Sequence, residues 1–508
     1  MPEPAGPEVT AAQAAGAAGA GRRAHVPDGL ILALACVAQF MVVLDVSIVN
    51  VALPSIGREL HYSATGLQWV VNAYVLTFAG FLLLGGRAAD LFGRRRVFVA
   101  GLALFTLASV AGGAAQTAGW LTAARAVQGI GGALLSPATL TIIVTTFPPD
   151  RRARALGIWS AVAGAGGAAG SILGGILTSA LSWRWVLFVN IPIGVIATIA
   201  ALAWLTEAAR SGPAAGPGPA PGAAPGVTPV AAPAPARRLD VAGAVTVTAG
   251  LGVLIYAIVG TESHPWGSAQ TIALLAAAAV LLAAFAVIEL RLARVPLVPL
   301  DLFRSRSVSA GNAVMFLVGA AFFSMWYFLS LYLQNVLGYS ALRAGTAFVP
   351  MAIAIIAGAQ ASSRLLPRIG VRPLLMTGTL LAAAGFAWLS RIDPHASYWG
   401  QVFGPGCIIA LALGVLFTPL AAAATTGVPP HQAGLASGVL NTSRQVGGSL
   451  GLAILATVAT DRTAALAGLG QRAALSSGYA RAFELAAVVC LLAFAASLAI
   501  PPIRRRLA

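Results

Sequence analysis

The sequence predicts an all-α protein that crosses a membrane many times. Of its 508 residues, 58% are hydrophobic and 9% are charged, and the mean hydropathy is +0.86. A soluble protein would contain roughly a quarter of charged residues. A spanning helix needs about 20 apolar residues. Fourteen such stretches occur, near 29–51, 67–89, 96–115, 119–146, 153–178, 184–206, 240–260, 269–290, 307–334, 343–365, 372–391, 400–425, 434–458 and 480–501.

The positions of the basic residues predict the orientation in the membrane. All 31 are arginine. With both termini in the cytoplasm, the cytoplasmic loops hold about three times as many arginines as the outer loops, which is the expected bias. The bias explains the net charge of +16 without a nucleic-acid partner. The Ala-, Gly- and Arg-rich composition is typical of a GC-rich bacterial genome, so we expect a multi-pass protein of the bacterial plasma membrane.

Composition and an internal repeat divide the chain. Ser136-Pro137 recurs as Thr418-Pro419, and the loop at 86–96 has a degenerate echo at 363–373. We therefore predict two related six-helix bundles with an extra helix pair between them, around a central substrate site. The predicted segments are a disordered cytoplasmic tail (1–27), an N-terminal bundle (28–207), a Pro/Ala/Gly-rich cytoplasmic linker (208–238), the extra pair (239–291), a C-terminal bundle (292–502) and a basic cytoplasmic tail (503–508).

One carboxylate, Asp45, lies within the apolar run of the first predicted span. A charge at that depth is costly and is rarely found without a partner or a function. In the fourth span Arg125, Gln128 and Gly129 share one helix face. Since Asp45 is the one acid in the middle of any predicted span, we expect it to pair with Arg125. The pair could be purely structural, or Asp45 could titrate, because the histidines all fall in tails or loops.

The loop between the second and third spans has the spacing G-x-x-x-D-x-x-G-R-R, formed by Gly86, Asp90, Gly93, Arg94 and Arg95. The arginines could serve only to anchor the loop in the cytoplasm. The complete spacing, however, resembles the signature that the major facilitator superfamily carries between its second and third helices. The resemblance implies a loop that stabilises one conformation of a transporter.

The fifth span carries a glycine motif made of Gly166, Gly170, Ser171, Gly174 and Gly175. Small residues at this spacing let helices pack closely. Antiporters of the superfamily have the similar pattern G-x-x-x-G-P-x-x-G-G, with Ser171 here at the position of the proline.

Together with the stretches at 44–54 and 182–192, this glycine motif resembles the fourteen-helix drug:proton antiporter branch, which includes multidrug and antibiotic exporters. Proton antiporters of the superfamily show a similar Arg-x-x-Gln-Gly pattern, which here is formed by Arg125, Gln128 and Gly129 and implies a part in proton coupling. Asp45 is the best candidate for the titrating group, by elimination.

We expect proton-driven export of amphipathic drugs or antibiotics, with the lipid bilayer, protons and a small molecule as partners. The candidates for the substrate cavity are polar residues within the predicted spans, namely Asn50, Asn72, Asn312, Gln360, Asn441, Arg444 and Gln445. A proton-coupled importer of a small metabolite, including an anionic one, and a non-transporting receptor or scaffold remain alternatives. The chain lacks a catalytic constellation, a P-loop and metal-ligand spacing, so we expect no enzyme, cofactor or metal site. Substrate identity and oligomeric state stay open.

Overall fold

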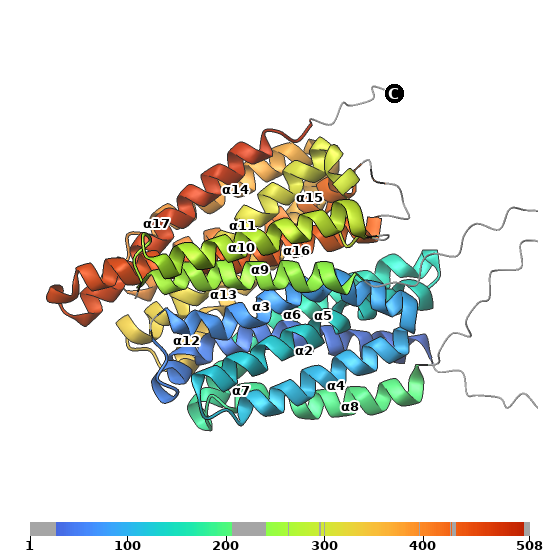
Figure 1. Cartoon of the computed structure of the whole chain (residues 1–508), viewed down its shortest axis with the longest axis horizontal. Coiled ribbons are helices and arrows are strands. Elements are labelled where there is room, and N and C mark those ends of the chain that lie inside the picture. Colours follow the sequence, from blue (N-terminus) through green and yellow to red (C-terminus); the bar gives the residue numbers. More distant parts are fainter. Residues whose placement is uncertain are drawn as a thin grey trace, which may run out of the picture.

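The computed structural model describes residues 27–63, 65–205, 240–262, 264–293, 296–298, 300–395, 397–426, 428 and 433–501, and its regular elements are all helices (Figure 1). The helices are α2 (Asp28–Glu59), α3 (Trp69–Phe92), α4 (Arg94–Gly113), α5 (Ala118–Thr146), α6 (Pro149–Ala180), α7 (Trp185–Phe188), α8 (Asn190–Trp204), α9 (Val241–Val259), α10 (Ala269–Val287), α11 (Arg306–Leu331), α12 (Ala341–Ala347), α13 (Val349–Ile369), α14 (Val371–Leu389), α15 (Phe403–Thr425), α16 (Ala433–Ala465) and α17 (Gln471–Ser497). The predicted linker and basic tail, and the first tail apart from Pro27, lie outside the described residues.

The helices form two groups that meet along a seam (Figure 1). Helices α2–α8 lie together in the blue and green half, and α11–α17 form the yellow to red half. Helix α9 covers the seam, because its Leu251 and Ile255 pack with Leu76 of α3 and Ala453 of α16. This arrangement agrees with two bundles and an added helix pair, although the exact domain boundaries stay a prediction.

The predicted count of fourteen spans is not confirmed. Twelve helices in the described residues are long and apolar enough to cross a membrane. The two predicted spans that fall short correspond to α6 and α16. Helix α16 has 33 residues but contains polar ones such as Arg444, which lower its mean hydropathy. Helix α6 has 32 residues, and its described apolar stretch is 165–180, because several side chains before that stretch lie outside the described part of the structure.

Corresponding turns in the two halves share a backbone feature. Gly93 separates α3 from α4 with φ at 97°, and Gly370 separates α13 from α14 with φ at 84°. Side chains rarely adopt this region of φ, so glycine is favoured at both turns. The loop echo in the sequence is therefore also an echo in backbone structure.

Candidate functional site

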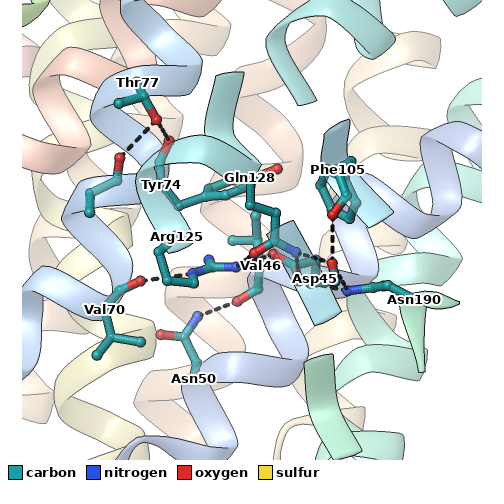
Figure 2. A network of polar contacts seen from close by, with 12 residues as sticks. Asp45, Val46, Asn50, Val70, Tyr74, Thr77, Phe105, Arg125, Gln128 and Asn190 are labelled. Carbon is teal, nitrogen blue, oxygen red and sulfur yellow. Dashed lines mark hydrogen bonds and ion pairs between the residues drawn. The ribbon is translucent and has the colours of Figure 1, made fainter. Parts of the chain in front are cut away.

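The predicted pair of Asp45 and Arg125 lies at the centre of a buried polar network (Figure 2). Arg125 Nη1 donates to Asp45 Oδ2 at 2.5 Å, and Arg125 Nη1 also donates to Gln128 Oε1 at 2.6 Å. Gln128 Nε2 donates to Asp45 Oδ1 at 2.8 Å. Asn190 Nδ2 donates to the same Oδ1 at 2.9 Å. The carboxylate is thus ion-paired and hydrogen-bonded on both oxygens, as a charge buried away from water requires.

Helix α3 holds the other side of the guanidinium. Arg125 Nε donates to the carbonyl oxygen of Val70 at 3.0 Å. The guanidinium carbon lies 4.4 Å from the ring centroid of Tyr74, a cation–π contact. Arg125 therefore has fixed partners besides Asp45, so its position does not depend on the ion pair alone.

Sequence reasoning missed two members of this network. Asn190 begins α8 and is fully buried, and Ser109 of α4 accepts hydrogen bonds from Gln128 at 2.8 Å and from Asn190 at 3.3 Å. The available signal for Asn190 was an amide two residues before Pro192 in an apolar run, within the stretch 182–192 that contributed to the family resemblance. Ser109 gave no comparable signal, because a lone serine in a spanning helix commonly bonds to its own backbone.

The glycine beside this network allows α5 to approach α3. A methyl group at Gly129 would overlap the carbonyl oxygen of Tyr74 and Oγ1 of Thr77. Thr77 also donates to the carbonyl of Ala126 at 2.7 Å, so α3 and α5 are joined directly next to Arg125 (Figure 2). The small residue after Gln128 is thus explained by backbone packing.

The glycine motif of α6 contacts two different helices. A methyl group at Gly170 would lie 2.8 Å from the carbonyl oxygen of Leu44, and one at Gly174 would lie 2.8 Å from that of Ile48. Gly166 meets α2 in the same way, one turn earlier. On the other side, a methyl group at Gly175 would lie 2.7 Å from the carbonyl oxygen of Ala341 at the start of α12. The motif packs α6 along the helix that carries Asp45 and against the other half of the molecule.

Ser171 takes part in that second contact. Its carbonyl oxygen occupies the space beside Gly345 of α12, where a methyl group would overlap it. Its hydroxyl donates to the carbonyl of Gly167 at 3.4 Å within α6.

The predicted loop motif lies at the ends of α3 and α4. Gly93 supplies the positive φ described above, and a methyl group at Gly86 would lie 3.7 Å from Cβ of Pro137 in α5. Arg95 Nη2 donates to the carbonyl of Leu202 at 2.7 Å, in the last turn of α8, where a cation favours the helix dipole. Arg94 begins α4, and the side chain of Asp90 lies outside the described part of the structure. The conformational role of the loop stays a prediction.

A cavity of about 270 Å³ lies between the two halves. Val43 and Ser47 of α2 line it, and they flank Asp45 at two residues on either side. Residues two apart lie on opposite faces of a helix. Helix α2 therefore presents Asp45 to the buried network and its other face to the cavity.

The predicted cavity residues occupy different places. Arg444 lines the cavity, with Nη2 donating to Asn441 Oδ1 at 2.9 Å. Asn312 Oδ1 accepts from Ser443 at 2.9 Å, Asn50 bonds to the carbonyl of Val46, and Gln445 is buried. Asn72 is buried beside Gln68 in the N-terminal half, whereas Gln360 is exposed. The structure thus brings one of the seven to the cavity wall, and the roles of the others in binding stay predictions.

Comparison with solved structures shows the fold. The chain aligns with a bacterial homologue of the human lysosomal transporter Spinster, in an inward-facing and unoccupied conformation, with a TM-score of 0.63 and 17% identity over 93% of this chain and 97% of that chain. A peptide transporter of the POT family, crystallised with sulfate, gives a TM-score of 0.62 at 16% identity, covering 93% of this chain and 95% of that one.

Sequence comparison gives nearer relatives. The chain is 44% identical over 462 residues to the cephamycin export protein CmcT of Amycolatopsis lactamdurans, covering 91% of this chain and 90% of that protein. It is 41% identical over 441 residues to the puromycin resistance protein pur8 of Streptomyces alboniger, covering 86% and 82%. It is 34% identical over 440 residues to the tetracenomycin C resistance and export protein of Streptomyces glaucescens, covering 86% and 76%.

A family model extends over most of the described helices. The model of the Major Facilitator Superfamily matches residues 35–452. This match, the relatives above and the shared transporter fold agree with the motifs that we identified in the loop and in the fourth span. The chain belongs to the Major Facilitator Superfamily and is a multi-pass membrane transporter of small molecules rather than an enzyme.

Proposed function

We propose that this transporter exports amphipathic drugs or antibiotics across the bacterial plasma membrane in exchange for protons. The observation that carries the proposal is the buried ion pair of Asp45 and Arg125, on a helix whose opposite face lines the central cavity. The relatives named for antibiotic export and resistance support the outward direction.

The network suggests how a proton exchanges for a substrate. Arg125 occupies Oδ2 of Asp45, so a proton arriving there displaces one hydrogen bond and leaves a neutral acid. The freed guanidinium keeps its contacts with Val70 and Tyr74. If substrate binding favours the deprotonated acid, protonation by linkage favours substrate release. Helix α2 transmits the effect because it forms part of both sites.

For the topology we propose fourteen spans with both termini in the cytoplasm. Helices α6 and α16 are the two added to the twelve apolar ones, since each has more than the about 20 residues that a span needs. Each also packs along the first helix of its half: glycines of α6 meet α2, and Gly447 and Gly451 of α16 meet α11.

Transport by the full chain in proteoliposomes tests the function. We expect an imposed pH gradient to drive accumulation of at least one of the compounds named for the relatives: cephamycin, puromycin or tetracenomycin C. Asp45→Asn should lower the driven rate about 100-fold or more, because the amide cannot carry the proton. Glu484→Gln is the matched control, since Glu484 pairs with Arg481 on the exposed surface.

Two outcomes would contradict the proposal. One is no gradient-driven movement of any of the three compounds by folded protein. The other is an Asp45→Asn variant that pumps at the wild-type rate, which would leave the pair with a structural role alone.

Single cysteines test the topology after the three native ones, Cys36, Cys407 and Cys490, have been replaced. Gly468→Cys, between α16 and α17, should react with a membrane-impermeant thiol reagent added to intact cells. Arg368→Cys, in the last turn of α13, should react only after permeabilisation. The reverse pattern would overturn the predicted orientation.

A further inference from the structure

Arg444 is the charged side chain of the central cavity, and we propose that it binds the anionic group of an amphipathic substrate. The apolar part of the same molecule would contact the aromatic wall of the cavity. This inference names the substrate class for the proposed function and rests on it for the transport step, but not for binding.

The hydrogen bonds of Arg444 leave room for a ligand. A guanidinium has five N–H donors. In the described part of the chain Arg444 makes one hydrogen bond, from Nη2 to Asn441 Oδ1 at 2.9 Å, so the other donors are available to a ligand. Within those residues no carboxylate lies at ion-pair distance from Arg444. A cation at membrane depth is costly without an opposite charge. A bound anion would supply that charge.

Much of the rest of the cavity wall is apolar and aromatic. Phe322, Phe323 and Trp326 line it from α11, and Phe417 lines it from α15. The guanidinium carbon of Arg444 lies 5.9 Å from the ring centroid of Phe417. A ligand that touched both would need a flat apolar body attached to a negative group. The volume of about 270 Å³ is near the lower end for small-molecule sites, so we expect a compact molecule.

Close backbone packing fixes Arg444 at this wall. A methyl group at Gly319 of α11 would overlap the carbonyl oxygen of Arg444, and one at Gly447 would overlap that of Phe316. The backbones of α11 and α16 therefore touch directly beside Arg444. An arginine held by rigid helices loses less freedom on binding a ligand than one on a loop.

The other buried arginine shows why the anion belongs at Arg444. The guanidinium of Arg125 already faces Asp45, Gln128 and Val70. Arg125 is fully enclosed, whereas Arg444 is partly accessible from the cavity. A substrate anion can thus reach Arg444 without breaking the Asp45 pair.

Calorimetric binding to the purified full chain tests this inference with three probes that share one aromatic ring system: 1-naphthylacetate, the neutral 1-naphthylacetamide and the cationic 1-naphthylmethylammonium. We expect the anion to bind about ten-fold or more tightly than the amide, since hydrogen bonds between charged groups are the strong ones. Arg444→Gln should remove that preference and leave affinity for the amide unchanged, and Arg444→Lys should retain part of it. Arg343→Gln is the control, because this arginine lies over Tyr339 on the exposed part of α12.

Equal affinities of the wild-type protein for anion and amide, or a preference for the cation, would overturn the inference. So would an Arg444→Gln variant that keeps the preference. If Arg444→Gln does not fold, the wild-type ratio and the Arg444→Lys variant still decide. These readouts need no pH gradient, so a failure of proton-driven transport would reject the proposed function and leave the binding result standing.

A separate observation concerns the contact between the two halves near Pro54, inside α2. Proline has no N–H, so the carbonyl of Asn50, four residues earlier, lacks its helical partner. Ser330 of α11 donates to this carbonyl at 2.7 Å, and Gln334 donates to the next one, of Val51, at 2.9 Å. Gln334 lies in a π-helical turn, Tyr332–Val336, a feature that is frequent at functional sites.

We infer that Ser330 and Gln334 latch the two halves together at this end of the cavity. The latch is reversible, because polar side chains hold a backbone acceptor that water can satisfy equally well. Pairs of spin labels at Arg58→Cys of α2 and Arg391→Cys, in the exposed turn after α14, report the separation in the purified protein. Ser330→Ala with Gln334→Ala should raise the population with a longer distance about five-fold or more.

Pro54→Ala should act in the same direction, because the restored N–H competes for the carbonyl of Asn50. The control is Ser363→Ala, which removes an exposed hydroxyl bonded to its own helix. Distance distributions that stay identical to wild type in the double variant and in Pro54→Ala would overturn the latch.

Discussion

Helices α5 and α15 occupy equivalent places in the two halves, and each contains a proline from the sequence repeat, Pro137 or Pro419. Arg125 lies twelve residues before the first proline, and Cys407 lies twelve residues before the second. Arg125 pairs with a buried carboxylate, whereas Cys407 is a free thiol. Of these two equivalent helices, α5 therefore carries a buried charge and α15 carries none at the matching position. The difference teaches that the ion pair is a local addition to a shared scaffold and is not needed to build it.

The backbone gaps left by the two prolines are closed differently. Each proline frees the carbonyl four residues earlier, that of Ala133 in α5 and that of Val415 in α15. Ser362 of α13 donates to the carbonyl of Val415 at 2.8 Å. In the N-terminal half Gly85 of α3 lies so close that a methyl group there would overlap the carbonyl oxygen of Ala133. A hydrogen bond in one half thus corresponds to direct backbone packing in the other.

The largest expected effect comes from removing the charge that distinguishes the halves. Arg125→Gln leaves Asp45 buried without a cation, and breaking a buried pair in this way costs about 3–5 kcal/mol. Cys407→Ala, the matched change in the other half, should cost less than about 1 kcal/mol. The free energy of unfolding, measured by SDS titration in mixed micelles, checks both values.

The double variant Asp45→Asn with Arg125→Gln sharpens this result. It should recover most of the lost stability, because no uncompensated charge remains, yet it should not transport on a pH gradient. Similar losses for Arg125→Gln and Cys407→Ala would contradict the view that charge balance separates the two halves.

The sequence was sufficient to predict the helical class and the central ion pair, and the reason is physical. One acid and one arginine on a helix face within the N-terminal spans leave few ways to balance charge, so the residue types alone were enough to match Asp45 with Arg125. Asn190 and Ser109 could not be matched, because amides and hydroxyls have many other acceptors in a helix. The aromatic wall of the cavity could not be predicted either, because the sequence does not distinguish a phenylalanine that faces a cavity, such as Phe322, from one that faces lipid.

The number of spans shows a related limit. Hydropathy reports the average side chain of a helix, whereas a helix packed between others needs small residues. Gly447 and Gly451 serve that packing in α16 against α11, and together with polar residues such as Arg444 they lower its mean hydropathy. The sequence therefore indicates where the helices lie better than it indicates which of them face lipid.

We expect an intermediate loss of stability from changes beside the carbonyl groups that the two prolines leave without a helical hydrogen bond. Gly85→Ala places a methyl group against the backbone of α5, and overpacking of this kind costs about 1–3 kcal/mol. Ser362→Ala removes one hydrogen bond between helices, which is worth about 0.6 kcal/mol on average in a membrane protein. The same SDS titration should therefore rank the glycine change above the serine change. The opposite order would mean that the hydrogen bond from Ser362 to the carbonyl of Val415 stabilises the protein more than the close packing at Gly85 does.

The smallest expected effect concerns the hydrogen bond that ties α16 to α11 in the C-terminal half. Ser443 donates to Asn312 Oδ1 at 2.9 Å, and neither partner carries a charge. Ser443→Ala should cost about 0.6 kcal/mol, the typical worth of a neutral bond between membrane helices. Because neither residue can take up or release a proton near neutral pH, the ratio of protons to substrate moved should stay at the wild-type value, even if the rate falls. Flux of protons, followed with a pH-sensitive dye enclosed in proteoliposomes, and uptake of substrate in the same vesicles give that ratio. A changed ratio would place part of the proton pathway in the C-terminal half. It would contradict the view, suggested by Arg125 and Cys407, that only the N-terminal half carries the proton.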